Sequence, residues 1–230
     1  MNPAIVRPLV TYAIALGAAF AFVRQCRKPK WLVGRFVLAR MNAGHSGLTE
    51  WGLSHLEIQR NATVLDVGCG GGRTIATIAD TATMGQVHGV DYSPASVAAS
   101  RAYNAGRIAE GRVDVQEASV SNLPFPPSTF DIVTAIETHY YWPHLSTDVK
   151  EILRVLKPGG AFMILAETYK GRSFDWLFRP VMTGLLGATY LSVDEHRALL
   201  SSAGFSDVQV SVERAKGWIC AVGRKRAPLS

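Results

Sequence analysis

Residues 64–74 read VLDVGCGGGRT and decide the fold. The apolar and β-branched residues at the start predict a short buried strand. Glycines then stand at alternate positions, Gly68, Gly70 and Gly72. Glycine adopts positive φ and lets a ligand approach the backbone. Residues 74–79 are compatible with a helix. A strand, a glycine turn and a helix in this order predict a ligand site at the carboxyl edge of a parallel sheet.

Outward from this loop, strands and helices alternate along the chain. Such alternation predicts an α/β protein with a doubly wound, mostly parallel, seven-stranded sheet. The last two strands are expected to form an antiparallel hairpin. The expected strands are residues 63–67, 87–91, 113–117, 130–136, 161–166, 208–212 and 218–222, and the expected helices are residues 48–56, 73–80, 94–111, 148–156 and 192–203.

The positive charge of the chain is concentrated at its N-terminus. The 230 residues carry a formal net charge of +6. Residues 1–40 hold seven Lys or Arg side chains and no acid, so the remainder has a net charge of −1. The main domain therefore lacks the basic excess that a nucleic-acid partner requires, and no such partner is predicted. The three cysteines lack metal-ligand or redox spacing, so neither a metal site nor a disulfide framework is expected.

An uncharged apolar run occupies residues 8–23, and four basic residues follow it by position 30. A spanning helix needs roughly 17 to 20 apolar residues, so this run is at the lower limit. We expect residues 1–30 to form a hydrophobic helix that anchors the chain in a membrane by a single pass, with the main domain in the cytoplasm. The alternatives are a removed signal peptide and a helix that packs on a cytoplasmic domain or lies in the membrane interface.

Two further divisions follow from the pattern. Residues 31–60 are interpreted as a helical lead-in or lid, and residues 61–230 as the main domain. Within that domain the strand rhythm stops in residues 168–191, which are rich in aromatic and aliphatic side chains. This segment is either a substrate lid or membrane-contacting element, or a helix packed on the sheet edge.

The glycine spacing decides between two nucleotide ligands. A dinucleotide site needs G-x-G-x-x-G. If this motif began at Gly68, its third glycine would fall at Arg73, and if it began at Gly70, it would fall at Ile75. The missing third glycine disfavours a nicotinamide oxidoreductase. The pattern acid-x-G-x-G-x-G, which begins at Asp66, instead resembles the first motif of class I S-adenosylmethionine-dependent methyltransferases.

Four further matches follow in the order of that family, whose nearest type is the ubiquinone/menaquinone or sterol methyltransferase. Asp91 ends the expected second strand, LPF begins at Leu123, FD begins at Phe130, and LKPGG occupies residues 156–160. The similarity covers residues 63–167. It implies a Rossmann-like methyltransferase fold and S-adenosylmethionine as the cofactor.

The resemblance also assigns roles around the loop. Asp66 would reach the methionyl ammonium of the cofactor, Asp91 would accept hydrogen bonds from the ribose, and Tyr92 would lie against the adenine. Ser119 departs from the family pattern, because an Asp usually holds the adenine amino group there. The cofactor-binding residues implied in this way are Asp66, Gly68, Gly70, Gly72, Asp91, Tyr92 and Ser119.

The aromatic run ETHYYWPH, residues 137–144, follows the fourth expected strand. In the family's fold this position faces the reacting methyl group, and aromatic rings there favour a cation. His139 is a candidate general base, because its ordinary pKa lies near working pH; it could equally only line the pocket. Glu137 is the second candidate catalytic residue, or it orients the amino-acid end of the cofactor.

The expected function is S-adenosylmethionine-dependent methyl transfer to a small, lipophilic acceptor. The anchor and the aromatic segment favour an acceptor that partitions into membrane. Positioning alone supplies much of the catalysis in such a displacement, so the sequence demands no catalytic residue. The alternative is a membrane-tethered S-adenosylmethionine-binding module or partner subunit without catalysis of its own.

Overall fold

The computed structural model describes residues 46–173, 175–185 and 187–227. The expected N-terminal hydrophobic helix of residues 1–30 lies outside the described residues, and so does the first half of the lead-in, up to residue 45. Within the described ranges, no helix is long and apolar enough to cross a membrane.

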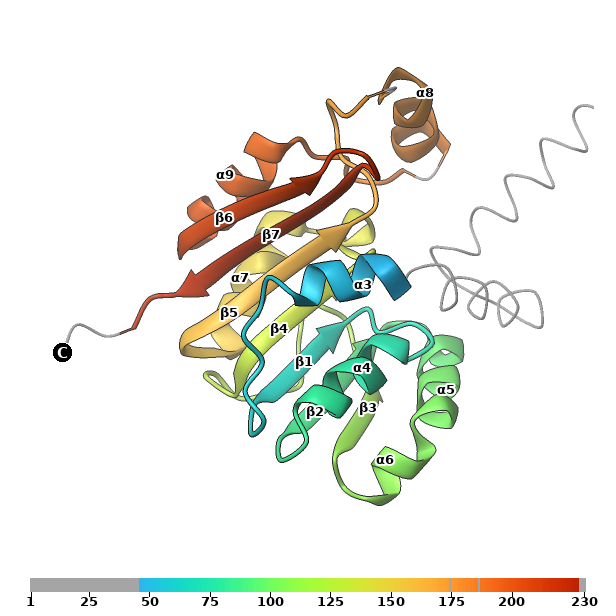
Figure 1. Cartoon of the computed structure of the whole chain (residues 1–230), viewed down its shortest axis with the longest axis vertical. Coiled ribbons are helices and arrows are strands. Elements are labelled where there is room, and N and C mark those ends of the chain that lie inside the picture. Colours follow the sequence, from blue (N-terminus) through green and yellow to red (C-terminus); the bar gives the residue numbers. More distant parts are fainter. Residues whose placement is uncertain (1–45, 174, 186, 228–230) are drawn as a thin grey trace, which may run out of the picture.

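The described residues build one seven-stranded sheet. Its strands are β1 (Thr63–Val67), β2 (Gln86–Asp91), β3 (Val113–Glu117), β4 (Phe130–Ile136), β5 (Leu156–Ala166), β6 (Phe205–Glu213) and β7 (Trp218–Lys225). They lie in the order β3-β2-β1-β4-β5-β7-β6 (Figure 1). Strands β1 to β5 pair in parallel, whereas β7 is antiparallel to β5 and β6. The expected doubly wound, mostly parallel sheet is confirmed. The strand order reverses between β1 and β4, where open α/β folds bind ligands.

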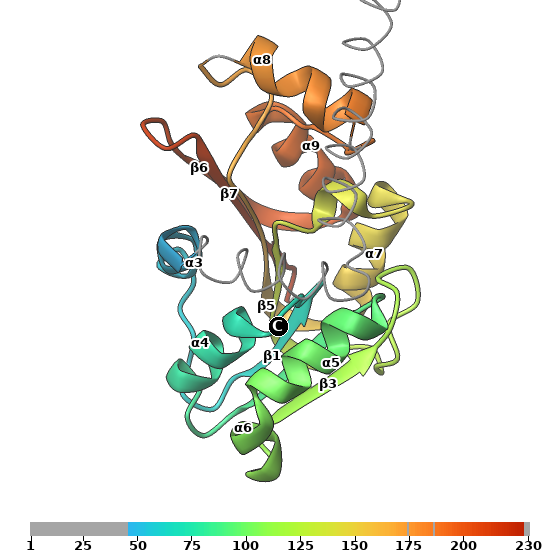
Figure 2. The same cartoon turned by 90° about the vertical axis from the view of Figure 1, so that its right-hand side faces the viewer.

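Helices cover both faces of this sheet. They are α3 (Ser46–Leu53), α4 (Arg73–Thr81), α5 (Pro94–Tyr103), α6 (Ala105–Ala109), α7 (Leu145–Val155), α8 (Asp175–Arg179) and α9 (Val193–Ala203), with the short turns η1 (His139–Tyr141) and η2 (Pro180–Leu185). Figure 2 shows α3 and α4 on one side of the sheet and α7 and α9 on the other. A full set of helices on both faces explains why the strands are almost continuously apolar.

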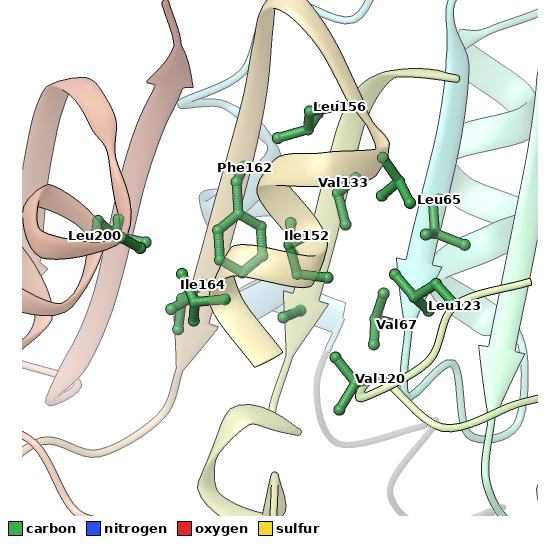
Figure 3. Packing of buried hydrophobic residues seen from close by; sticks show 14 of the residues in the cluster. Leu65, Val67, Val120, Leu123, Val133, Ile152, Leu156, Phe162, Ile164 and Leu200 are labelled. Atoms are coloured by element: carbon green, nitrogen blue, oxygen red, sulfur yellow. The ribbon is translucent and has the colours of Figure 1, made fainter. Parts of the chain in front are cut away.

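Successive side chains of β5 belong to two different cores, because side chains alternate along a strand. Phe162 packs with Ile152 of α7 and Leu200 of α9 (Figure 3). Met163 points the other way and packs with Leu48 of α3. The side chains of these five residues are all less than 3% exposed. The two cores hold the strands rigidly, so the loops at their carboxyl ends have a fixed frame.

The single helix expected over residues 94–111 is wrong, because the chain breaks it at Asn104. The Asn104 side-chain amide donates to the carbonyl oxygens of Gly72, at 2.9 Å, and Ser100, at 3.1 Å. A side-chain amide that bonds to the backbone competes with helix continuation. The break therefore separates α5 from α6 and ties the end of α5 to the glycine loop.

Strand β5 begins at Leu156, five residues before the expected start. Phe130 of β4 pairs with Leu156, but Ile132 pairs with Ala161. Residues 157–160, the KPGG sequence, are therefore accommodated as an irregularity within the strand. This feature lies at the amino end of the sheet, opposite the edge at which the glycine loop stands.

The segment of residues 168–191 combines packed and exposed parts. Tyr169 and Tyr190 are both 8% exposed, and the Tyr190 hydroxyl donates to the Tyr169 carbonyl oxygen at 2.7 Å. Between them, α8 leaves Trp176 74% exposed. Figure 1 shows α8 beyond the carboxyl end of β5. The two interpretations of this segment both stay predictions.

Candidate functional site

The glycine loop after β1 is fastened to the end of β2 by backbone donors. The amides of Gly68 and Cys69 both donate to the Val90 carbonyl oxygen, at 2.8 and 3.0 Å. The Gly70 amide donates to Oδ2 of Asp91 at 3.0 Å. Gly68 and Gly70 have positive φ values of 76° and 51°, which glycine adopts without strain. The loop and the end of β2 therefore form one unit at the switch point of the sheet.

Asp91 is buried, with 7% of its surface exposed. Its Oδ1 accepts the Ser93 amide at 2.9 Å, and Oδ2 accepts the Gly70 amide. Burial raises the pKa of Asp91, and hydrogen bonds from the Ser93 and Gly70 backbone and the Ser96 side chain lower it. A carboxylate offers about four lone-pair sites. Asp91 therefore keeps acceptor capacity for a ligand hydroxyl.

Two further predicted cofactor residues are neighbours of Asp91. Tyr92 is its neighbour in the chain, and Ser119 follows β3, the strand that pairs with β2. Tyr92 follows Asp91 directly and is 41% exposed. The Ala118 amide donates to the Asp91 carbonyl oxygen at 3.1 Å, which brings the exposed Ser119 beside the end of β2. The Ser119 hydroxyl oxygen accepts the Ser121 amide at 3.2 Å.

Asp66 is buried near the end of β1, with 2% of its surface exposed. The Thr134 hydroxyl of β4 donates to its Oδ1 at 2.7 Å. Burial raises the pKa of Asp66 to about 7, the bond from Thr134 opposes this, and the charge of Asp91 adds to it. A buried carboxyl that is half ionised at neutral pH is well suited to a cationic ligand group, which would favour its charged form.

Gly68 and Gly72 are also required by packing within the chain. A Cβ atom on Gly68 would collide with the Thr138 side chain, and one on Gly72 would collide with Ser100 and Asn104. Both have positive φ, which is 81° at Gly72. Their place in the motif therefore has a structural reason beside the predicted contact with a cofactor.

Glu137 follows β4 and has an unusual backbone φ of 58°. Its Oε1 accepts hydrogen bonds from the Glu167 amide and from the Tyr140 hydroxyl, the latter at 3.3 Å. Burial raises the pKa of Glu137 to about 8, and the neighbouring Glu167 carboxylate adds to the shift. Glu137 is therefore largely protonated at neutral pH and joins the carboxyl ends of β4 and β5.

His139 lies in η1 and is fully buried. Its ring contacts that of Tyr140 at a centroid distance of 4.3 Å, and its Nε2 lies 3.4 Å from Nε2 of His196 in α9. Burial, and secondarily the charge of His196, hold the pKa of His139 well below its usual value. His139 is thus neutral, and the surrounding protein buries its side chain completely.

Three contacts of this site escaped the sequence patterns. The sequence predicted Thr134 only as part of a strand, Thr138 only as part of the aromatic run, and His196 only as part of the helix of residues 192–203. The Thr138 hydroxyl accepts from the Trp142 indole at 3.3 Å. The spacing of 57 residues between the two histidines carries no signal that they meet. Within the described ranges, no cluster of side chains is arranged to hold a metal ion.

The chemistry of this set matches S-adenosylmethionine, which presents an ammonium, ribose hydroxyls and an adenine but no phosphate. Two buried carboxyl groups stand at the ends of β1 and β2, and an exposed aromatic ring follows the second. A sheet of this order with such a loop defines the Rossmann-like methyltransferase class of α/β proteins.

Comparison with known proteins agrees. Residues 65–164 match the family described as "Methyltransferase domain". The chain is 30% identical over 181 residues to the uncharacterized methyltransferase sll0829 of Synechocystis, covering 75% of this chain and 80% of that one. It is 28% identical over 189 residues to the uncharacterized methyltransferase YdaC of Bacillus subtilis, covering 81% and 96%. It is 36% identical over 165 residues to the ubiquinone/menaquinone biosynthesis C-methyltransferase UbiE of Geobacter sulfurreducens, covering 63% and 64%.

The fold has a solved counterpart in a structure described as the complex between the Haloferax volcanii Trm112 methyltransferase activator and the putative methyltransferase. The TM-score is 0.74 at 22% identity, and the match covers 89% of this chain and 97% of that one. The chain therefore belongs to the methyltransferase domain family, and it is an S-adenosylmethionine-dependent methyltransferase.

Proposed function

We propose that the chain methylates a small, lipophilic acceptor, with the donor held at the glycine loop and the acceptor at the carboxyl ends of β4 and β5. The placement of the methyl donor is supported by the hydrogen bond from the Gly70 amide to the Asp91 carboxylate. This bond joins the glycine loop and the end of β2 into one unit that would face the cofactor. S-adenosylmethionine, when bound, supplies an electrophilic methyl group on a sulfonium.

On the donor side, Asp66 holds the methionyl ammonium and Asp91 accepts a ribose hydroxyl. Tyr92 lies against the adenine and Ser119 accepts from its amino group. Gly70, with Gly68 and Gly72, lets the backbone approach the ligand. The burial of Asp66 and Asp91 and the exposure of Tyr92 and Ser119 support this division.

On the acceptor side are two candidate bases, Glu137 and His139. Tyr140 contacts His139 and donates to Glu137, so it connects them. Because burial and the Glu167 carboxylate raise the pKa of Glu137, its protonated form serves there as a hydrogen-bond donor or orienting group. The neutral ring of His139 is the candidate proton acceptor.

The lipophilic acceptor is supported by the surroundings and by the relatives. The exposed Trp176 of α8 supplies aromatic surface. Helix α8 lies beyond the carboxyl end of β5 (Figure 1). UbiE, by its name, belongs to ubiquinone and menaquinone biosynthesis, and a second relative is named sterol 4-C-methyltransferase. These names motivate quinols and sterols as the first acceptors to test.

The domain division is part of the same proposal. Residues 1–30 anchor the chain in a membrane by one pass, residues 31–60 lead into the domain, and residues 61–230 carry the methyltransferase in the cytoplasm. The basic flank after the apolar run supports this orientation. An anchor would hold the site close to acceptors dissolved in the bilayer.

The test is formation of S-adenosylhomocysteine by the purified full-length chain with separate panels of quinols, sterols, phospholipid head groups and fatty acids. Product with a quinol, sterol or fatty acid is expected. Product with head groups alone would contradict the lipophilic acceptor. Absence of product from every panel, with the donor still bound, would favour the binding module without catalysis.

A further inference from the structure

Two buried histidines from distant parts of the chain meet under the acceptor region. His139 lies in η1, directly after β4, and His196 lies in the first turns of α9. They are 0% and 1% exposed, and their Nε2 atoms lie 3.4 Å apart. A hydrogen bond between two imidazoles needs a proton on one Nε2 and a lone pair on the other.

The third partner of the pair decides which histidine donates. Nδ1 of His196 lies 2.8 Å from the Ser192 carbonyl oxygen, which only accepts hydrogen bonds. Nδ1 of His196 therefore carries the proton. Burial lowers the pKa of both rings, so both are neutral and each carries one N–H. Nε2 of His196 is consequently the acceptor, and Nε2 of His139 is the donor.

This assignment leaves Nδ1 of His139 as a bare lone pair. That atom is buried and has no hydrogen-bond partner among the described residues. Buried polar atoms of proteins nearly always have a partner, and an unpaired one is costly. The unpaired Nδ1 belongs to a ring that contacts Tyr140 in the turn directly after β4, so a ligand O–H or N–H that reached this buried atom would satisfy it.

We propose that His196 is a positioning residue, which fixes His139 in the tautomer that turns a bare Nδ1 toward the proton of the methyl acceptor. The proposal rests on the proposed function in one respect, that His139 is the base.

The proton balance of the step is simple. As the bond from the acceptor's oxygen or nitrogen to the methyl carbon forms and the carbon–sulfur bond breaks, the acceptor's proton passes to Nδ1 of His139. His139 is then an imidazolium whose Nε2–H still donates to His196, now as a charge-assisted bond. The proton afterwards returns to water, and S-adenosylhomocysteine leaves as a neutral sulfide.

The first test reads the tautomers by ¹⁵N NMR of histidine-labelled full-length protein without added ligand. The expected spectrum has an unprotonated Nδ1 and a proton-bearing Nε2 for His139, assigned by the loss of its signals in His139→Gln. His196→Gln should keep this tautomer, because its amide oxygen accepts from Nε2 of His139. His196→Leu, of similar volume but without an acceptor, should populate both tautomers. A protonated Nδ1 in the natural chain would overturn the proposal, and so would an unchanged spectrum in His196→Leu.

The second test separates positioning from fold stability. In the S-adenosylhomocysteine-forming assay, with an acceptor from the panels that gives product, His196→Leu should lower kcat about 100-fold with little change in KM for the donor, whereas His196→Gln should stay within about threefold. Equal kcat in both variants would contradict the positioning role. If the natural chain forms no product while NMR shows the expected tautomer, the failure lies with the proposed function and not with the histidine pair.

Discussion

At the scale of single residues, the carboxyl group of Asp66 links ligand binding to protons. Burial raises the pKa of Asp66 to about 7, so below pH 7 the Asp66 carboxyl group is largely neutral before a ligand binds. A ligand ammonium favours the charged carboxylate and lowers this pKa. Binding of S-adenosylhomocysteine at pH 6 to 7 should therefore release up to about one proton, and affinity should weaken as pH falls below 7. Calorimetry in two buffers of different ionisation enthalpy measures the release.

The matched control is Asp66→Asn, which keeps the shape of the side chain and an oxygen for the Thr134 hydroxyl. This variant should bind more weakly and lose the proton release that depends on residue 66. The proton count must be compared between the two chains, because Glu137 also has a pKa raised to about 8. An identical proton count in both chains would refute the placement of the ammonium at Asp66.

Residue patterns predicted the positions of the carboxylates but not their partners. Asp66 and Asp91 could be located because each stands at the end of a recognisable strand. The contacts of Thr138 with Gly68, of Asn104 with Gly72 and of His196 with His139 join segments far apart in sequence. No single-sequence signal encodes such pairings, because they depend on how helices dock on the sheet.

At the scale of secondary-structure elements, the junction of the glycine loop with α4 and α5 should tolerate no side chain at Gly72. Its φ is 81°, and a Cβ atom there would meet the backbone of Ser100. Gly72→Ala should lower the free energy of unfolding by at least ~2 kcal/mol. Urea denaturation followed by circular dichroism measures this change.

A matched glycine lies one helix away. Gly106 of α6 has no atom within 4 Å of an added Cβ, and its φ is not in the left-handed region. Gly106→Ala should therefore raise the free energy of unfolding by ~0.5–1 kcal/mol. If the two substitutions changed stability equally, close packing at Gly72 would not explain its place in the motif.

The elements themselves were predicted well where one physical signal dominates. The apolar strands and the helix expected over residues 192–203 correspond to elements of the structure, in which a capping box at Ser192 begins α9. The break at Asn104 and the early start of β5 at Leu156 were missed. Each follows from a tertiary contact or a strand pairing that overrides local preference.

At the scale of the whole molecule, the proposed anchor sets where the enzyme works. The full-length chain should sediment with membranes and resist carbonate extraction, because the apolar run would cross the bilayer. A chain that lacks residues 1–30 should remain in the supernatant and bind S-adenosylhomocysteine with unchanged affinity. Full-length protein found wholly in the supernatant would contradict the anchor.

The central claim concerns the unit formed by the glycine loop and Asp91, and one calorimetric titration tests it most directly. The natural chain should bind S-adenosylhomocysteine. Asp91→Ala should lose on the order of 100-fold in affinity, because charge-assisted hydrogen bonds to the ribose disappear. Asp114→Ala is the control, since that carboxylate is 60% exposed on the neighbouring β3 and should leave affinity unchanged. Affinity equal to that of the natural chain in Asp91→Ala would contradict the claim.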